Sequence, residues 1–390
     1  MHRTDMRSAD QDLNTIIALS REYGANPDYV LGGGGNTSVK NNEILHVKAS
    51  GIPLAGITAD GFVAMSRRAL NAIWTKTYSR DADAREAAVL ADMMKACTAG
   101  GSAAEARTAG GSAAGNARRP SVESLLHNLF PFRYVVHIHP TMVNGLTCSV
   151  NNVRAAREIL GEEFIWLPVL DPGYVLAAAL REALEHSRSR PESTKLMLLQ
   201  NHGVFAAADS AAEIRSIYGA LFSRIAQRID KEPAQNSREL TDSVSRRLMT
   251  RAAAALPGKS LLMFTNSDID NCIMNEQNFA GLRLSITPDH IVYCGYRPLF
   301  VNDPAELEHD IAAFQHNEGF APVIIAVRGQ GIIAAQENDR KAALAKQLFE
   351  DNVKIVMYAR SFGGVQFMPE ANINFIRNWE AEKYRAAKTT

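Results

Sequence analysis

The sequence predicts an α/β protein with two units, a larger one followed by a smaller one. Helical apolar patterns alternate with short apolar runs along most of the chain. The chain has 390 residues, more than one hydrophobic core usually holds. A segment near residue 200 also recurs near residue 330, which indicates that the second unit is related to the first.

The elements of the larger unit follow from their apolar spacing and from residues suited to helix caps and turns. The helices expected here are 12–23, 67–74, 82–96, 121–130 with Ser121 as the cap, one that follows Asn151, 176–187, and 211–229 after Ser210. The strands expected here are 38–40, 44–48, 62–65, 134–139, 164–167 and 196–199.

The composition excludes several classes of protein. The chain is 46% hydrophobic and 22% charged, and its 42 basic residues balance its 42 acidic ones. This balance does not favour binding to nucleic acid or to a membrane surface. The four cysteines are scattered, the N-terminus is polar, and no apolar stretch is long enough to cross a membrane. We therefore expect a cytoplasmic enzyme whose thiols stay reduced.

One segment has an unusual composition. Residues 98–116 consist almost entirely of Ala, Gly, Ser and Thr, and TAGGSAA occurs in them twice, at 98–104 and 108–114. So few large apolar groups cannot anchor a segment to a core, which predicts a mobile loop.

The internal repeat in the second unit becomes visible when Gly203 is aligned with Gly331. The segment LMLLQNHGVFAA (196–207) then falls on IIAVRGQGIIAA (324–335), and Ser210 falls on Asn338, each before a long amphipathic helix. We interpret the second unit as a degenerate copy, because Gln330 takes the place of His202.

The same segment contains a GxGxxA pattern formed by Gly329, Gly331 and Ala334. A dinucleotide fingerprint requires a helix that starts at the glycines. Here Ile332 continues an extended run, and the helical pattern begins only at Asn338. We therefore do not predict a nucleotide site.

Three histidines carry the main chemical signal. His137 and His139 follow an apolar run, and side chains two apart on a strand point to the same side. His202 follows a second apolar run and precedes a glycine. The HxH pair alone would equally suit two satisfied histidines near a core edge. With His202 added, the pattern favours a catalytic Zn²⁺ site with an open position, or a site for another divalent metal.

Other polar residues gave weaker signals. Glu123 lies near a predicted helix start, where a carboxylate can simply complement the helix dipole. His127 lies one turn later and can either hydrogen-bond Glu123 or line the site. The runs GGGGNTS (32–38) and KASGIP (48–53) are small polar turns whose amides can approach an anion.

Taken in order, GGGGNTS (32–38), KASGIP (48–53), PSVE (120–123), HIHP (137–140) and QNHG (200–203) resemble the class II aldolase/adducin family, which includes L-fuculose- and L-rhamnulose-phosphate aldolases. The resemblance covers about residues 12–230. Two later segments, DHIVYCGYRPLFV (289–301) and INFIRNWEAEKYR (373–385), resemble the aldolase part of bifunctional aldolase/short-chain dehydrogenase proteins. We expect this chain to lack their dehydrogenase domain.

The resemblance implies an αβα sandwich with a mostly antiparallel central sheet in a catalytic domain at 1–240. The smaller α/β domain would span 241–390. His137, His139 and His202 would bind the metal, and Glu123 would be the general acid/base. The resemblance assigns the substrate phosphate to Gly35, Asn36, Ser50, Gly51 and Ser121. Val122 stands where the family often has a second serine, and Lys48 can compensate for it with a charge-assisted contact.

The function expected from this resemblance is cleavage of a ketose 1-phosphate, such as rhamnulose or fuculose 1-phosphate. The products would be dihydroxyacetone phosphate and an aldehyde such as lactaldehyde. Alternatives on the same metal site are a sugar-phosphate epimerase and a dehydratase. A further alternative is a non-enzymatic, adducin-like assembly module. We expect a small sugar phosphate as the only partner besides copies of the chain itself, in a homotetramer.

Overall fold

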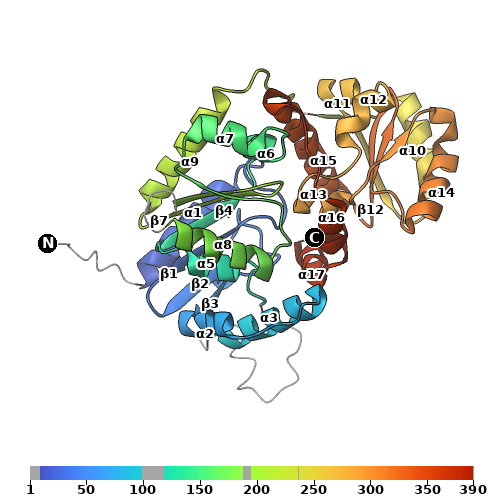
Figure 1. The fold of residues 1–390 in the computed structure, drawn as a ribbon. Coiled ribbons are helices and arrows are strands. Elements are labelled where there is room, and N and C mark those ends of the chain that lie inside the picture. The colour runs from blue at the N-terminus through green and yellow to red at the C-terminus, as the bar shows by residue number, and fades with distance from the viewer. Residues whose placement is uncertain (1–8, 99–117, 188–194, 236, 390) are drawn as a thin grey trace, which may run out of the picture.

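Two β-sheets organise the computed structural model, which describes residues 9–98, 118–187, 195–235 and 237–389. The larger sheet has seven strands and the smaller sheet has five. In Figure 1 the larger unit runs from blue to yellow-green, the smaller sheet is yellow to orange, and red helices lie between them. The predicted α/β class with a second, smaller unit is confirmed. Apart from Thr98, the predicted loop at 98–116 lies outside the described residues.

The larger sheet has the strand order β3-β2-β1-β4-β7-β6-β5. Only β5 and β6 are parallel, so the prediction of a mostly antiparallel sheet is confirmed. Its strands are β1 (Asn36–Lys40), β2 (Ile44–Lys48), β3 (Phe62–Ser66), β4 (Tyr134–Ile138), β5 (Ile165–Leu167), β6 (Leu196–Leu199) and β7 (Gly203–Ala208). The α-helices of this unit are α1 (Ala9–Gly24), α2 (Arg67–Ala72), α3 (Ala82–Ala96), α5 (Ser124–Leu129), α6 (Thr141–Thr147), α7 (Asn152–Leu160), α8 (Tyr174–His186) and α9 (Ala211–Ala226).

Helices cover both faces of this sheet, because alternate strand residues face opposite sides. Val136 and Leu198 belong to a core shared with α1, α6, α7 and α9. Val135 and Met197, one position away, belong to a second core shared with α3, α5 and α8. The predicted αβα sandwich is therefore observed.

Most predicted helices differ from the observed ones by one to three residues at an end, and two of them also differ in form there. The helix expected at 121–130 begins only at Ser124, and Ser121 does not cap it. Residues 121–123 instead form a turn in which the Ser121 carbonyl accepts the Ser124 amide at 3.1 Å. The helix expected at 67–74 is α-helical only to Ala72 and then tightens into a 3₁₀ turn, Ile73–Thr75. Such tightening is common where a helix ends.

The smaller sheet has the order β10-β11-β12-β9-β8. Its strands are β8 (Arg238–Glu239), β9 (Ser260–Thr265), β10 (Leu299–Val301), β11 (Ile324–Val327) and β12 (Gly331–Gln336). The α-helices of this half of the chain are α10 (Ser243–Ala255), α11 (Ser267–Cys272), α12 (Glu276–Phe279), α13 (Pro288–Cys294), α14 (Leu307–Glu318), α15 (Asp339–Ala359), α16 (Glu370–Asn378) and α17 (Glu380–Thr389). The domain limits at residue 240 stay a prediction.

The two sheets share one pairing pattern. In the larger sheet β5 is parallel to β6, β6 is antiparallel to β7, and β7 is antiparallel to β4. The strands β10, β11, β12 and β9 repeat this series. The register also repeats, since Leu196 lies opposite Ala206 and Ile324 lies opposite Ala334. This agreement supports a duplicated unit.

The helices after the repeated hairpins begin in the same way. The Ser210 side chain accepts the amide of Glu213, and the Asn338 side chain accepts the amide of Lys341. Between Gly331 and Asn338 the chain is the extended strand β12, so no helix starts at the GxGxxA glycines.

The long helix α15 joins the two units. It packs against α6 of the larger unit and against β9 and β12 of the smaller sheet (Figure 1). The helix α13 packs against α15 and α16, which places the start of α13 beside the larger unit. Among the described residues, no helix combines the length and apolarity required to span a bilayer.

Candidate active site

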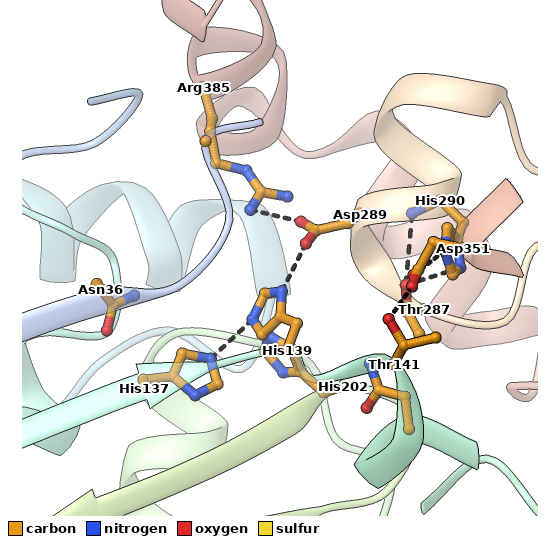
Figure 2. A network of polar contacts seen from close by, with 12 residues as sticks. Asn36, His137, His139, Thr141, His202, Thr287, Asp289, His290, Asp351 and Arg385 are labelled. Carbon is orange, nitrogen blue, oxygen red and sulfur yellow. Dashed lines mark hydrogen bonds and ion pairs between the residues drawn. The ribbon is translucent and has the colours of Figure 1, made fainter. Parts of the chain in front are cut away.

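Three histidines converge where β4 ends. His137 is the fourth residue of β4, His139 follows the strand, and His202 lies in the turn between β6 and β7. Because β7 pairs with β4, this turn lies beside the end of β4. The ligand atoms of the three side chains all lie within 4.8 Å of one another. Figure 2 shows the three imidazoles close together, as the sequence predicted.

The hydrogen bonds of two rings determine which nitrogen faces the centre of the group. His137 Nδ1 lies 3.0 Å from the Val204 carbonyl oxygen, which can only accept, so Nδ1 carries the proton. His139 Nδ1 lies 2.5 Å from Oδ2 of Asp289. The Nε2 atoms of His137 and His139 therefore face inward, 2.9 Å apart. His137 is also held by Phe205, whose ring stacks on it with a centroid distance of 3.9 Å.

Burial keeps two of these imidazoles, those of His137 and His202, neutral. Burial, with a contribution from the neighbouring His139, lowers the pKa of His137 well below its usual value. Burial lowers the pKa of His202 to about 3 although Glu123 opposes the shift. Neutral imidazole is the form that binds metal. Three imidazole nitrogens in this arrangement fit Zn²⁺ or another divalent ion with one coordination position left open.

Glu123 directs a carboxylate toward the same point. It lies just before α5 and is nearly fully buried. Its Oε2 lies 3.5 Å from His137 Nε2 and accepts a hydrogen bond from Asn36 Nδ2 at 2.5 Å. Its Oε1 lies 3.9 Å from His202 Nε2 and has no hydrogen-bond partner within the described part of the chain. One oxygen is held and the other can exchange a proton.

Asn36 owes its position to strand register, because it lies opposite His137 in the β1–β4 pair. Its Oδ1 accepts a hydrogen bond from His127 Nε2, while His127 Nδ1 contacts Ser38 Oγ at 2.7 Å. The sequence left open whether His127 bonds Glu123 or lines the site. The His127 amide donates to the Glu123 carbonyl at 3.2 Å, but its fully buried ring reaches the Glu123 carboxylate only through Asn36.

The other predicted substrate-binding residues surround one small cavity beside the histidines. Its walls include Gly35, Asn36, Lys48, Ser50, Gly51 and Ser121, together with Glu123, His139 and His202. Gly35 has φ +60°, and a Cβ there would lie 2.7 Å from the His137 carbonyl oxygen, so a larger residue does not fit.

The serine amides in this cavity are already bonded. The Ser50 amide donates to the Arg119 carbonyl at 2.8 Å, and the Ser121 amide donates to the Lys48 carbonyl at 3.2 Å. The resemblance implied anion binding through both amides and hydroxyls. In this structure these two serines can offer only their hydroxyl groups to a ligand.

Lys48 forms a buried wall of the cavity. Its Nζ donates to the Ile52 carbonyl at 2.7 Å and is more weakly placed toward the Gly33 carbonyl at 3.4 Å. Burial, with the charge of Arg385 adding to it, lowers the pKa of Lys48 to about 7. Lys48 therefore lies where the resemblance would require an additional phosphate donor.

Three further residues of the site come from the second half of the chain. Asp289 lies in α13, and Glu382 and Arg385 lie in α17. Arg385 Nη1 lies 2.8 Å from Asp289 Oδ1, and Arg385 Nε lies 2.6 Å from Glu382 Oε2. Burial acts to raise the pKa of Asp289, but the neighbouring His139 ring and Arg385 guanidinium outweigh it and keep the carboxylate ionised.

Sequence reasoning missed these three residues. They lie in the segments 289–301 and 373–385, whose likeness to the aldolase part of bifunctional proteins was visible in the sequence. No spacing rule connects them to the histidines, because they reach the site only through tertiary packing.

Comparisons with known proteins agree with this architecture. The family described as "Class II Aldolase and Adducin N-terminal domain" matches residues 14–218. A curated relative, the uncharacterized oxidoreductase YuxG of Bacillus subtilis, is 20% identical over 95% of this chain. The chain spans only 57% of the length of that relative.

The chain is also similar to solved structures. The N-terminal class II aldolase domain of a conserved Thermoplasma acidophilum protein is 25% identical, with a TM-score of 0.45. The match covers 58% of this chain and 98% of that one. An L-fuculose-1-phosphate aldolase from Thermus thermophilus is 15% identical, with a TM-score of 0.34, and covers 56% of this chain and 94% of its own.

Proposed function

The chain belongs to the class II aldolase and adducin family, and from this premise we propose that it is a metal-dependent aldolase. The substrate is a ketose 1-phosphate of the rhamnulose or fuculose type. The products are dihydroxyacetone phosphate and an aldehyde such as lactaldehyde. One observation carries the proposal: the ring nitrogens of three histidines lie close together with one carboxylate, beside a single cavity.

The reaction is a reversible retro-aldol cleavage. The C4 hydroxyl loses its proton, the C3–C4 bond breaks, and the aldehyde leaves. The remaining enediolate takes a proton on carbon to become dihydroxyacetone phosphate, so protons balance overall. When bound, a divalent ion supplies Lewis-acid stabilisation of the negative charge, worth several kcal/mol.

Glu123 delivers the proton in this proposal. Its Oε1 faces the cavity without a hydrogen-bond partner in the described residues, whereas Oε2 is held by Asn36. A carboxylate with one fixed and one available oxygen can move a proton without changing its position. The hydrogen bonds from His127 to Asn36 and from Asn36 to Glu123 keep the Glu123 carboxylate oriented.

The phosphate end of the substrate occupies the side of the cavity formed by Gly35, Asn36, Ser50, Gly51 and Ser121. Lys48 adds a positive charge on this side. A doubly charged anion beside it favours the protonated form of the Lys48 amine. Val122 also lines the cavity and offers no donor from its side chain. The same metal site would also suit an epimerase or a dehydratase that acts on a sugar phosphate.

The decisive measurement is the product. Metal-loaded protein is incubated with a panel of six-carbon ketose 1-phosphates that includes the L-rhamnulose and L-fuculose forms, and dihydroxyacetone phosphate is quantified. The aldolase proposal expects release that is lost in His139→Ala. If metal-replete protein releases no dihydroxyacetone phosphate but converts a sugar phosphate without splitting it, the protein is instead an epimerase or a dehydratase. We propose a homotetramer as the active form, which light scattering tests.

A further inference from the structure

The geometry points to Asp289 as a positioning residue for the metal centre, contributed by the second half of the chain and itself held by Arg385. This inference rests on the proposed metal-dependent function. It assigns a role to the smaller unit, in which Gln330 takes the place of His202 in the repeat.

Asp289 contacts His139 as a carboxylate does when it supports a metal-binding histidine from the side away from the metal. Asp289 Oδ2 lies 2.5 Å from His139 Nδ1, while His139 Nε2 faces His137 (Figure 2). A histidine that donates one ring N–H to a carboxylate has its ring orientation and tautomer determined, and its other nitrogen becomes a better ligand. Both side chains are less than one-tenth exposed, so water does not compete for this bond.

Arg385 holds the other oxygen of the same carboxylate. Its Nη1 lies 2.8 Å from Asp289 Oδ1, as the upper dashed line in Figure 2 shows. Its guanidinium is also paired with Glu382 and lies 5.8 Å from the centre of the Tyr293 ring. One oxygen contacts His139 and the other forms an ion pair with Arg385, so the Asp289 carboxylate is held against the His139 ring.

A second set of contacts holds the helix that carries Asp289. The next residue, His290, contacts Asp351 Oδ2 at 3.0 Å through Nε2. Asp351 Oδ1 accepts a hydrogen bond at 2.5 Å from Thr141, which lies two residues after His139. These contacts hold α13 against the larger unit but touch none of the three histidine rings.

The two networks therefore provide a matched pair of variants. Asp289→Asn keeps the size of the side chain and removes the charge behind His139. Asp351→Asn makes the same chemical change in the contacts with His290 and Thr141. Those contacts also join the two units, but they do not reach the metal ligands. A role for Asp289 that is only structural predicts similar effects of the two substitutions on metal binding.

The experiment measures binding of Co²⁺ and Zn²⁺ to the full chain by competition with a chelator, and records the visible spectrum of the Co²⁺ form. We expect Asp289→Asn to weaken metal binding about 10- to 100-fold and to shift the Co²⁺ bands. Asp351→Asn should stay within about threefold of wild type and keep the wild-type spectrum.

Wild-type affinity and spectrum in Asp289→Asn would overturn the inference and leave the proposed metal centre intact. Absence of metal binding by the wild-type protein would overturn the proposed function and the inference together. Should Asp289→Asn fail to fold, Arg385→Gln decides the question, because it releases one carboxylate oxygen and leaves the other on His139. We expect it to weaken metal binding by a smaller factor than Asp289→Asn, and unchanged affinity would overturn the role of the pair.

Discussion

The Asp289 carboxylate and the His139 imidazole are 150 residues apart in the chain and 2.5 Å apart in the fold. This contact makes the second half of the chain part of the candidate active site. The α17 residues Glu382 and Arg385 complete the same cavity wall. The two units therefore form one site, although each has its own sheet and core.

The strand register is the same in both sheets, so it identifies the residues of the second sheet that correspond to the three histidines of the first. His137 lies opposite Phe205 in the first sheet, and Met263 lies opposite Ile333 at the equivalent position of the second. The position of His139 then corresponds to Thr265. With Gln330 in place of His202, the repeated position offers no imidazole. The predicted loss of a ligand in the second copy thus extends to all three positions.

Glu123→Gln tests the assigned proton donor. We expect turnover to fall on the order of 10²- to 10⁴-fold, because an amide cannot exchange the proton. The bound metal should remain, because the histidines are unchanged. Turnover and metal content are measured on the same preparation. Wild-type turnover in this variant would remove Glu123 from the mechanism.

Gly34→Ala tests the contact between the two units without altering either partner. A Cβ at this position would lie 2.6 Å from Asp289 Oδ2 and 3.2 Å from His139 Nδ1. We expect it to push the two groups apart, weaken metal binding, and cost about 1–3 kcal/mol of stability. Gly56→Ala is the control, because a Cβ there meets no atom within 4 Å. Equal metal affinity in the two variants would contradict the prediction.

Lys48 makes the stability of the fold depend on pH. Burial lowers its pKa to about 7 from 10.5, so between these values the unfolded chain binds a proton that the folded chain does not. Stability should therefore rise with pH across this window, by about 1 kcal/mol per unit relative to Lys48→Met, which cannot titrate. Urea unfolding of both proteins from pH 7 to 9 measures the difference. Parallel stability curves would show that Lys48 titrates normally.

Arg119 should hold α17 over the cavity. The α17 residues Ala381, Glu382 and Arg385 line this cavity. Arg119 pairs with Glu380 through two hydrogen bonds, of 2.9 and 2.6 Å, and its guanidinium lies 4.5 Å from the centre of the Tyr384 ring.

Because Glu380 is largely exposed, the ion pair is worth at most about 1 kcal/mol. We expect Arg119→Ala to speed hydrogen exchange of the α17 amides about fivefold. The matched control is Arg154→Ala, which removes an exposed ion pair with Glu158 on α7. Exchange in α17 that responds equally to both substitutions would contradict this role for Arg119.

Local structure was largely predictable because it depends on short-range patterns. The strand at 196–199 and the helix at 82–96 were predicted with the bounds that they have. Ser210 caps its helix as expected, since a serine before an apolar helical stretch can accept an amide N–H. Ser121 failed as a cap because the turn it forms delays the helix until Ser124, and residue type alone does not distinguish a cap from a turn.

The sequence by itself determined the ordered motifs, the three histidines, Glu123 and the repeat that relates the two units. These are properties of residue type and spacing, and strand periodicity converts them into neighbours on one sheet edge. Only the tertiary structure decided that His127 acts through Asn36, that the serine amides are already bonded, and that Asp289 and Arg385 reach the site. Those contacts depend on strand register and on the packing of α13, α15 and α17, which bring together residues that no local pattern relates.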